Sequence, residues 1–469
     1  MRCDGGRRPP APCFVVAAVA ARSLVRRIVA RLGDAPTATG KPLAAVAAAM
    51  TVVALDDTDS RTAGMCTTYA AHLVAEELRD CGVDVERVLL VRLNPAVAYK
   101  TRGNAALAVH ADVDPQVGLE VASRVVEEHA EVGDDRTNPG VVVAQETDAP
   151  PAVAEFAERA LREDLDPGEA QSLAAAHGYE TAGWGNGRGV VGALAAVGAW
   201  AAFDDWTYEC IHYRPRERWG TTREVDPASV FEAADAAYPD AWDTVDREAG
   251  DLVCVPHTPG PILYGIRGDD AETVRWVAGE IDSEPVHASE LFVTNQGTDA
   301  HLADAALADV ADGRAYRVDA TVATDPETRE GGHVFLDVED DGERLACVAF
   351  EPTKRFRDRV RRLRAGDRVT ACGEVADGTL KLEKFAVRDL VTTERVTPTC
   401  PDCGRSMESA GADQGYRCRD CGTSTPGKER RQVDRELEAG WYEVPPRARR
   451  HIARPLVRGE WDAPVHPER

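Results

Sequence analysis

Lysine is scarce in this chain of 469 residues. Only six of its 55 basic residues are lysine, and arginine supplies the rest. Asp and Glu together number 80, so the formal net charge at pH 7 is −25. A surplus of acid usually argues against a nucleic-acid partner. An acidic, arginine-rich composition is however typical of salt-loving archaea, whose high salt screens self-repulsion. Local charge is therefore more informative here than total charge.

The chain also lacks a membrane span near its N-terminus and a disulfide framework. The apolar stretch at residues 14–21 is too short to cross a bilayer, which excludes a membrane partner at this point. Eight of the twelve cysteines are scattered without regular spacing. This usage favours a reducing compartment, so we expect a cytoplasmic protein.

Residues 1–49 differ from the rest in carrying eight basic and two acidic residues. A signal peptide is one interpretation of this basic, partly apolar segment. We prefer another, in which the natural start is Met50, because Met50 directly precedes the first predicted strand. On that interpretation residues 1–49 form a non-native or disordered extension.

Strands and helices alternate through residues 50–168. Apolar periodicity predicts strands at 51–55, 85–93, 105–110 and 141–145, and helices at 65–80 and 115–129. This alternation predicts an α/β or α+β domain that ends near the Pro-Gly turn at 167–168. Residues 169–312 contain a Gly-rich run, an apolar helix ending at 202, a strand at 207–213 and a helix near 270–280. They predict a second α+β domain.

Residues 313–392 are dominated by short strands. The strand-like segments are 314–324, 333–338, 344–350, 368–375 and 380–387. Five short strands with turn residues between them predict a small β-barrel of the oligonucleotide-binding (OB-fold) type.

Four cysteines form the strongest motif. Cys400 and Cys403 make one C-x2-C pair, and Cys418 and Cys421 make a second pair fourteen residues later. Each pair can place two thiolates on one tetrahedral Zn²⁺, so we predict a structural zinc ribbon at residues 393–426. A redox pair or two disulfides is the alternative.

An acidic cluster follows the first predicted strand. Asp56, Asp57 and Asp59 come directly after the apolar residues 51–55, and a hydroxyl-rich helix start follows at 66–68. Crowded carboxylates repel one another unless a cation lies among them. Carboxylates at a strand end suit Mg²⁺ that is shared with substrate phosphates. An acidic loop on an acidic protein is the alternative.

Two further loops have the composition of phosphate-binding segments. Residues 100–104 contain two cations and a hydroxyl after a strand, and residues 186–189 combine glycines with Asn186 and Arg188 ahead of a helix. Cations and helix N-termini both stabilise phosphate oxygens. Simple polar turns are the alternative, and the absence of GxxxxGK[ST] excludes a P-loop.

Two basic segments predict a nucleic-acid surface. Residues 354–364 contain seven cations around a single acid, with Phe356 among them, and a second cluster lies at 447–451. From Cys400 to Arg469 the chain has 13 basic and 12 acidic residues, against −25 for the whole. Together with a barrel and a zinc ribbon, such a distribution predicts nucleic-acid binding. A solvated helix face is the alternative for residues 354–364.

Several motifs in the same order closely resemble the archaeal tRNA(Ile) 2-agmatinylcytidine synthetase family. The resemblance runs from about residue 50 to the end. The matching segments are DDTDS (56–60), GMCTTY (64–69), NPAVAYKTRGN (94–104), TNPG (137–140), GNGRGVVGALAAVGAW (185–200), TYECIHYR (207–214), TNQGTDAHL (294–302) and the two C-x2-C pairs.

The resemblance implies both an architecture and a reaction. The architecture is an α+β multidomain fold: an ATP-dependent cytidine kinase-like α/β domain (50–168), a ferredoxin-like domain (169–312), an OB-fold barrel (313–392), a zinc ribbon (393–426) and a basic tail (427–469). The reaction is ATP-dependent ligation of agmatine to the 2-position carbon of the wobble cytidine in the isoleucine tRNA that reads AUA. Phosphorylation of the cytidine 2-oxygen would make that oxygen a good leaving group. ATP and Mg²⁺ would be required, with Zn²⁺ in a structural role.

The resemblance also assigns roles to individual residues. It implies metal and acid–base roles for Asp56, Asp57 and Asp59, and matches Thr67 to a threonine that family members phosphorylate on themselves. The expected ATP-binding residues are Thr58, Ser60, Lys100, Arg102, Asn104, Asn186, Gly187 and Arg188.

Substrate contacts are predicted from the chemistry of three further segments. Asp205 and Glu209 lie beside Trp206 and Tyr208 and are candidates for holding cationic agmatine, with an ordinary strand edge as the alternative. His301 is expected to be structural or an RNA contact rather than a metal ligand. The predicted RNA-binding residues are Lys354, Arg355, Phe356, Arg357, Arg447, Arg449 and Arg450.

Two competing functions are compatible with parts of the sequence. A non-catalytic binding protein could be built on the barrel and ribbon, but it would have no need for the acidic cluster and the two phosphate-binding loops. An ATP-dependent ligase or kinase acting on another RNA would need the same loops. The oligomeric state has no signature in the sequence.

Overall fold

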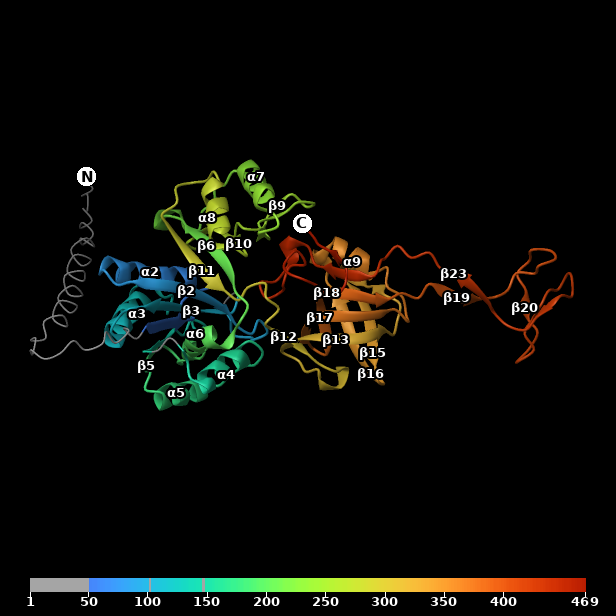
Figure 1. The fold of residues 1–469 in the computed structure, drawn as a ribbon, viewed down its shortest axis with the longest axis horizontal. Helices are drawn as coiled ribbons and strands as arrows, with labels where there is room; N and C mark the ends of the chain where they lie inside the picture. Colours follow the sequence, from blue (N-terminus) through green and yellow to red (C-terminus); the bar gives the residue numbers. More distant parts are fainter. Residues whose placement is uncertain (1–49, 101–102, 146–147) are drawn as a thin grey trace, which may run out of the picture.

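The computed structural model describes residues 50–100, 103–145 and 148–469. The predicted extension at 1–49 and the predicted ATP-binding residue Arg102 lie outside the described residues. The described chain forms a large sheet covered by helices, a β-barrel beside it and an arm that projects from the barrel (Figure 1). Among the described helices, none combines the length and apolar character that a membrane span requires.

A nine-stranded mixed sheet forms the core of the first body. Its strand order is β5 (Glu180–Gly183), β4 (Gly140–Ala144), β1 (Thr51–Asp56), β3 (Ala105–Ala111), β2 (Val85–Arg92), β11 (Ala288–Thr294), β6 (Thr207–Tyr213), β10 (Ile262–Gly268) and β7 (Ala241–Trp242). Neighbouring strands are antiparallel except for β2 and β11, which pair in parallel through Leu89–Val293 and Leu90–Thr294. This parallel pair joins the first five strands to the last four in one continuous sheet.

Helices cover both faces of the sheet. The helices α2 (Thr67–Asp80) and α3 (Pro115–His129) pack on one face. The opposite face is covered by α4 (Pro151–Ala160), α5 (Pro167–Ala176) and α6 (Gly189–Ala202). The last strands are covered by α7 (Pro227–Ala237) and α8 (Ala271–Glu280).

The helix α6 packs beneath the early strands, because its apolar residues share a core with β1, β3 and β4. Within the sheet, the change from the first five strands to the last four therefore comes after α6. The domain boundary expected at residue 168 stays a prediction.

The second body is a closed five-stranded barrel. Its strands are β13 (Arg314–Val322), β15 (Val334–Asp340), β16 (Glu343–Ala349), β17 (Arg368–Ala376) and β18 (Thr379–Asp389). They pair in the closed order β13, β15, β16, β18, β17 and back to β13. All five predicted strands are confirmed. The short helix α9 (Arg355–Val360) places Phe356 and Val360 in the barrel core.

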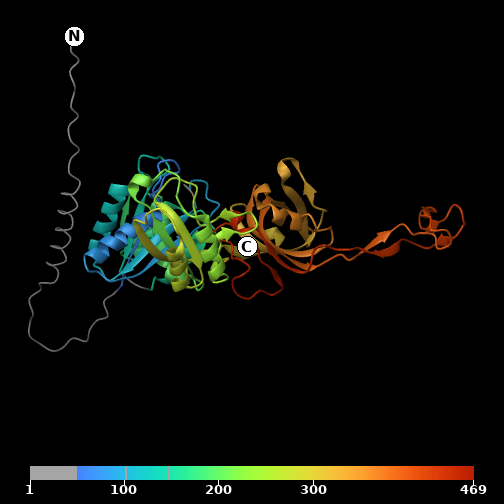
Figure 2. The same cartoon turned by 90° about the horizontal axis from the view of Figure 1, so that it is seen from above.

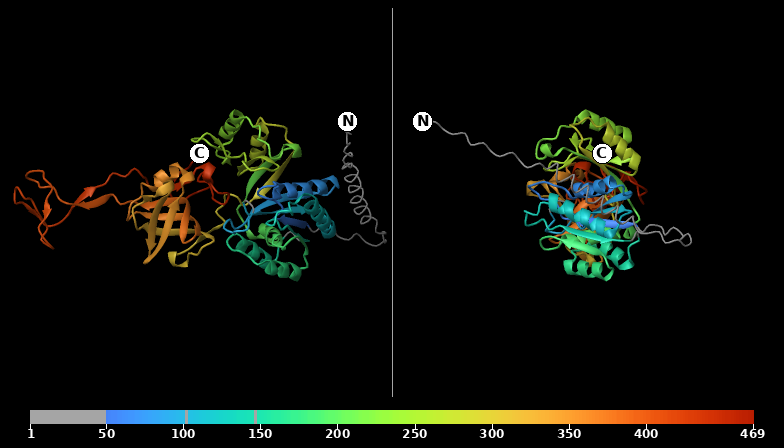
Figure 3. Two further views of the ribbon diagram at one scale, coloured as in Figure 1. Left: turned by 180° about the vertical axis from the view of Figure 1, so that it is seen from behind. Right: turned by 90° about the vertical axis from the view of Figure 1, so that its left-hand side faces the viewer.

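The arm carries the four cysteines. It leaves the barrel through β19 (Thr393–Val396), which pairs with β23 (Glu429–Gln432). Beyond this ladder lies a small sheet of β20 (Glu408–Ser409), β21 (Tyr416–Arg417) and β22 (Ser424–Thr425). Figures 2 and 3 show the arm pointing away from the large sheet.

The tail (residues 427–469) returns from the arm to the two bodies. Its strand β24 (Gly440–Glu443) pairs with β18 of the barrel, and β25 (Val465–His466) pairs with β24. Trp441 and Tyr442 are buried there. Much of the predicted basic tail is therefore part of the folded structure between barrel and sheet. The remaining short strands are β8 (Val245–Asp246), β9 (Asp251–Leu252), β12 (Leu302–Asp304) and β14 (Glu327–Thr328).

Candidate active site

A cavity of about 770 Å³ lies where β1 ends. Separate parts of the chain form its wall: the acidic cluster after β1, the first residues of α2 and α6, the loop at 250–258, side chains of β6 and β10, and two residues of the tail. Its size suits a nucleotide or a base with its phosphate, since ligand cavities usually measure about 300–1,000 Å³.

The acidic cluster faces this cavity. Asp57 has a φ of 60°, so the chain turns sharply at the end of β1. Its backbone N–H donates to Asp56 Oδ1 at 2.7 Å, and its Oδ2 accepts from the N–H of Asn138 at 2.9 Å. A Cβ on Gly192 would lie 1.9 Å from Asp56 Oδ2. Only glycine at this position of α6 leaves room for the Asp56 carboxylate.

Burial makes the acidic cluster reluctant to ionise in the absence of a cation. Burial raises the pKa of Asp56 well above its usual value, and the neighbouring charges of Asp57 and Asp59 raise it further. Burial and the charge of Asp59 raise the pKa of Asp57 to about 6, although the Asn138 N–H and Arg188 oppose this. A bound cation would favour the ionised forms.

The three aspartates do not form a closed metal site of their own. Among the described residues, only the four cysteines bring three or more potential metal-ligating side chains within 4.8 Å of one another. A divalent ion at the acidic cluster would thus need further ligands. This arrangement fits Mg²⁺, which is usually held by one or two carboxylates, water and substrate phosphates.

Two helix N-termini face the cavity beside the acidic cluster. The helix α2 begins at Thr67 with no acidic residue in its first turn and no side-chain cap on its N–H groups. The helix α6 begins at Gly189 with the same features. The Thr67 hydroxyl accepts a hydrogen bond from Thr58 at 3.2 Å. The positive ends of helix dipoles stabilise phosphate oxygens, so the two helix starts frame a place for an anion.

Three of the predicted ATP-binding residues line the cavity: Lys100, Asn104 and Arg188. The guanidinium of Arg188 lies 3.5 Å from the centre of the Tyr99 ring and forms an ion pair with Asp164 at 3.7 Å. Burial lowers the pKa of Lys100. These cations lie where they can neutralise a triphosphate.

The other described residues of that prediction have local structural roles outside the cavity lining. Ser60 Oγ donates to Asp134 Oδ2 at 2.7 Å. The backbone N–H of Asn186 donates to Asn138 Oδ1, while Asn186 Oδ1 accepts from the N–H of Arg188. Thr58, Ser60, Asn186 and Gly187 thus shape the loops on which the lining residues sit.

The two predicted agmatine residues are separated. Glu209 lines the cavity, but Asp205 lines a different cavity of about 690 Å³, where it pairs with Arg458 at 3.2 Å. The prediction that they act together is wrong, because the side chain of Glu209 lies on the sheet face while Asp205 precedes β6.

Glu209 lies in a group of buried polar side chains. Its Oε1 accepts from Arg267 Nε at 3.3 Å, and its Oε2 accepts from Gln296 Nε2. Gln296 Oε1 in turn accepts from Arg92 Nε at 3.0 Å. Burial is the main cause that lowers the pKa of Arg92, to about 10. His451 of the tail lies beside them, and burial next to Arg92 and Arg267 lowers its pKa well below the usual value.

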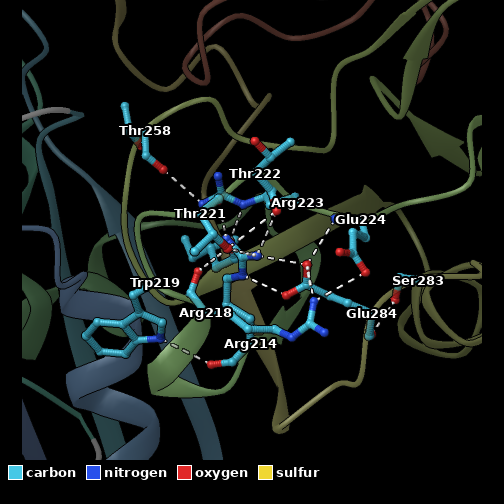
Figure 4. A network of polar contacts seen from close by, with 11 residues as sticks. Arg214, Arg218, Trp219, Thr221, Thr222, Arg223, Glu224, Thr258, Ser283 and Glu284 are labelled. Atoms are coloured by element: carbon cyan, nitrogen blue, oxygen red, sulfur yellow. Dashed lines mark hydrogen bonds and ion pairs between the residues drawn. The ribbon is translucent and has the colours of Figure 1, made fainter.

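A buried polar network anchors the wall formed by residues 250–262. Arg214 pairs with Glu284, both side chains being fully buried, and also donates to the carbonyls of Thr221 and Thr222 (Figure 4). Arg223 continues from this turn to the carbonyl oxygens of Thr258 and Ile262 at 2.9 and 2.8 Å. The network therefore fixes the loop that closes one side of the cavity.

The predicted RNA-binding residues at 354–357 are engaged within the protein. Phe356 is fully buried in the barrel core, so the prediction that it interleaves with nucleic acid is wrong. Arg355 pairs with Asp246 at 3.0 Å and with Glu468, and Arg357 donates to the carbonyl of Gly332. Lys354 is exposed but pairs with Glu351.

The second basic cluster joins the two bodies. Arg447 lines the cavity and pairs with Asp251 at 2.6 Å. Arg449 pairs with Asp243 and, at 2.8 Å, with Glu443. Arg450 pairs with Glu374 and Glu383 of the barrel. Since carboxylates of the protein already hold these guanidinium groups, the cluster is not a free surface for phosphates.

The four predicted zinc ligands lie together at the end of the arm. The Sγ atoms of Cys400, Cys403, Cys418 and Cys421 all lie within 4.8 Å of one another. The two pairs have matching turns: the N–H of Gly404 donates to the carbonyl of Cys400, and that of Gly422 to the carbonyl of Cys418. Four converging thiols fit a tetrahedral Zn²⁺ with no open position, which confirms the cysteine cluster.

The structure also brings residues into the cavity that had no motif to identify them. These are Tyr99, Arg92, Arg267 and His451, together with the loop at 250–258. Gln296 belongs to a polar segment that the sequence marked only as a loop. His301 is fully buried, and its Nε2 contacts the carbonyl of Arg92 at 3.1 Å, in accord with the predicted structural role.

Acids flanked by two helix N-termini and two cations have the donor set that phosphoryl transfer from a nucleoside triphosphate requires. Three family models match the chain: the TiaS TCKD domain over residues 52–116, the TiaS FLD domain over 187–301 and the TiaS C-terminal zinc ribbon domain over 397–437.

Whole-chain relatives agree with these models. The tRNA(Ile) 2-agmatinylcytidine synthetase TiaS of Haloquadratum walsbyi is 52% identical over 463 residues, covering 90% of this chain and 100% of that protein. The protein of the same description from Methanosarcina mazei is 46% identical over 419 residues, covering 87% and 97%. The chain therefore belongs to the TiaS family of tRNA(Ile) 2-agmatinylcytidine synthetases.

Solved structures of similar proteins include bound substrates. A crystal structure of TiaS in complex with its isoleucine tRNA and ATP has a TM-score of 0.81 and 40% identity, covering 90% of this chain and 100% of that one. A crystal structure of TiaS with the same tRNA, AMPCPP and agmatine has a TM-score of 0.79 and 37% identity, with the same coverage.

Proposed function

We propose that this protein uses ATP to attach agmatine to C2 of the wobble cytidine in the isoleucine tRNA that reads AUA. The observation that carries the proposal is the single cavity in which the acidic cluster, two helix N-termini, Lys100 and Arg188 meet. Membership of a family whose members carry this activity in their names supports the choice of substrates.

The chemistry requires two displacements. The cytidine 2-oxygen attacks the terminal phosphorus of ATP, the bond from that phosphorus to the bridging oxygen breaks, and ADP leaves. The agmatine amine then attacks C2, and the 2-oxygen departs with the phosphate. Lys100, Arg188 and the N-terminal N–H groups of α2 and α6 would stabilise the phosphoryl oxygens. The acidic cluster would hold Mg²⁺, which shields the charge of ATP.

The amine must lose a proton before or during its attack. An ammonium group has no free lone pair, so a nearby base is needed. Asp57 is suitable, because burial and Asp59 raise its pKa to about 6, closer to neutral pH than an exposed carboxyl. Thr67 lies at the start of α2 in the same cavity and is the residue for which we propose self-phosphorylation.

The barrel and ribbon would hold the rest of the tRNA. We propose that the first five strands with their helices form a kinase-like unit, that the later four strands form a ferredoxin-like unit and that the barrel is an OB-fold. Since the clusters at 354–357 and 447–450 are engaged internally, RNA contacts are better sought on the arm. Its exposed cations are Arg405, Arg417, Arg419, Lys428, Arg430 and Arg431. We further propose a cytoplasmic location, where the tRNA is found.

Mass spectrometry of the wobble cytidine tests this proposal. The protein would be incubated in high salt with the AUA-reading isoleucine tRNA, ATP, Mg²⁺ and agmatine. A mass gain matching agmatine, lost when ATP or agmatine is withheld, is the expected result. No mass gain with tRNA still tightly bound would instead favour a binding protein or another amine.

A further inference from the structure

Glu209 and the acidic cluster occupy different ends of one cavity. Along the sheet, β6 lies four strands from β1, which corresponds to about 19 Å between backbones at the usual strand spacing. Asp57 and Glu209 extend into the space between these strands. That length accommodates a phosphoryl group and a pyrimidine ring in line.

The Glu209 carboxylate is held as a fixed acceptor. The exposed fraction of its side chain is 6%. The side chains that contact it, Arg267 and Gln296, both donate hydrogen bonds to it. Each carboxylate oxygen can accept more than one hydrogen bond, so acceptor capacity remains on both. A Cβ on Gly265 would lie 2.7 Å from Glu209 Oε1, and the absence of a side chain there leaves room for the carboxylate.

Charge argues against a guanidinium ligand for this carboxylate. Arg92 and Arg267 already accompany Glu209, which gives the three ionised groups a formal net charge of +1. His451 carries little charge there because burial and both arginines lower its pKa. A further cation such as agmatine would meet repulsion. A neutral N–H donor would meet none.

We infer that Glu209 reads the target base by accepting a hydrogen bond from the 4-amino group of cytosine. This inference rests on the proposed function, in which the 2-oxygen of that base faces the acidic cluster. The 4-amino group and the 2-oxygen flank N3 on the Watson–Crick edge, so a base with its 2-oxygen toward Asp57 directs its amino group toward Glu209. Enzymes that extrude a base commonly read this edge.

The same contact excludes uracil. Cytosine presents an amino donor at position 4, whereas uracil presents a carbonyl acceptor there. Because Arg267 and Gln296 hold Glu209 as an acceptor, a carbonyl oxygen would face a carboxylate without a proton between them. Glu209 is thus a specificity-determining residue for cytidine over uridine at the wobble position.

The test begins with the unmodified enzyme and altered tRNA. One tRNA carries cytidine at the wobble position, and another carries 2-pyrimidinone, which keeps O2 and N3 but has hydrogen in place of the 4-amino group. We expect kcat/KM to be roughly 10- to 100-fold lower for the second tRNA, the usual loss when a built hydrogen-bond partner is left without its donor. Equal kcat/KM for the two would overturn the inference. No product with the cytidine tRNA would instead refute the proposed function.

The variant Glu209→Gln completes a double-mutant cycle. We expect it to lower kcat/KM for the cytidine tRNA and to show at most a few-fold difference between the two tRNAs, because the partner on the enzyme has changed. The matched control is Glu290→Gln, another buried glutamate paired with arginine but outside the cavity lining. It should keep the wild-type preference. A Glu209→Gln enzyme with the full preference and a raised KM for agmatine would show an agmatine contact and overturn the inference.

Discussion

Arg449 of the tail and Asp243 of the turn after β7 form an ion pair in which the side chains are only 2% and 6% exposed. Glu443 of β24 contacts the same guanidinium at 2.8 Å. One cation therefore serves two carboxylates at the junction of barrel and sheet, and charge that the sequence attributed to RNA binding instead joins the two bodies.

The variant Arg449→Ala should destabilise the protein by about 3–5 kcal/mol, since it leaves two carboxylates buried without their cation. Chemical denaturation in high salt measures this change. The control is Arg430→Ala, an exposed residue of β23, which should change the free energy of unfolding by less than about 0.5 kcal/mol. Unchanged stability of Arg449→Ala together with weaker tRNA binding would return this residue to the RNA surface.

Stability should depend on pH through Glu443. Burial raises the pKa of Glu443 to about 7, despite Arg449 and two backbone N–H groups that oppose it. The folded protein thus binds a proton that the unfolded chain releases near its ordinary pKa. The free energy of unfolding should fall as pH rises from about 4.5 to 7, by at most about 3 kcal/mol from this group.

The Glu443→Gln variant isolates that contribution. Denaturation of both proteins between pH 5 and 8 should show a flatter profile for the variant, and the difference between the two should level off above pH 7. Parallel profiles would mean that Glu443 stays ionised throughout this range.

The variant Asp57→Asn should abolish product formation, with a loss in kcat of at least about 100-fold, because an amide neither accepts a proton nor neutralises a metal ion. Affinity for tRNA, measured by filter binding, should remain within a few-fold of wild type. The exposed Asp112→Asn at the other end of β3 provides the control. Normal turnover by Asp57→Asn would exclude the acidic cluster as the metal site.

The variant Cys403→Ser should lose zinc and unfold the ribbon while leaving the barrel and sheet folded. Structural zinc supplies folding free energy directly, and a site with three thiolates holds the ion less tightly. We expect one equivalent of zinc in the wild type, none in the variant and weaker tRNA binding. Cys81→Ser, at the end of α2, should bind zinc and tRNA normally. Wild-type affinity of the zinc-free protein would show that the ribbon does not grip the tRNA.

Much of the first layer could be predicted because its residues follow simple rules. The strand at 207–213 and the helix at 115–129 occur at the predicted residues, since each has a clear apolar period. The acidic cluster was identifiable because three carboxylates together are costly without a partner. The four cysteines were identifiable from spacing alone.

The errors came from charge that concealed apolar periodicity. Phe356, Val360 and Leu363 lie four and three residues apart and are buried in the barrel core, although arginines surround them. This spacing is the signal that would have identified a core-facing helix. For Arg449 no local signal exists, since its partner Asp243 is distant in sequence and meets it only in the folded chain.

The tail has a consequence for the order in which the site is assembled. Arg447 and His451 complete the cavity wall, yet they follow every strand of the large sheet and the barrel in the sequence. On the ribosome, the acidic cluster and both helix starts emerge hundreds of residues earlier. A nascent chain can therefore fold its sheet without possessing a finished site, and competence to modify a tRNA arises only after the barrel and arm are also made.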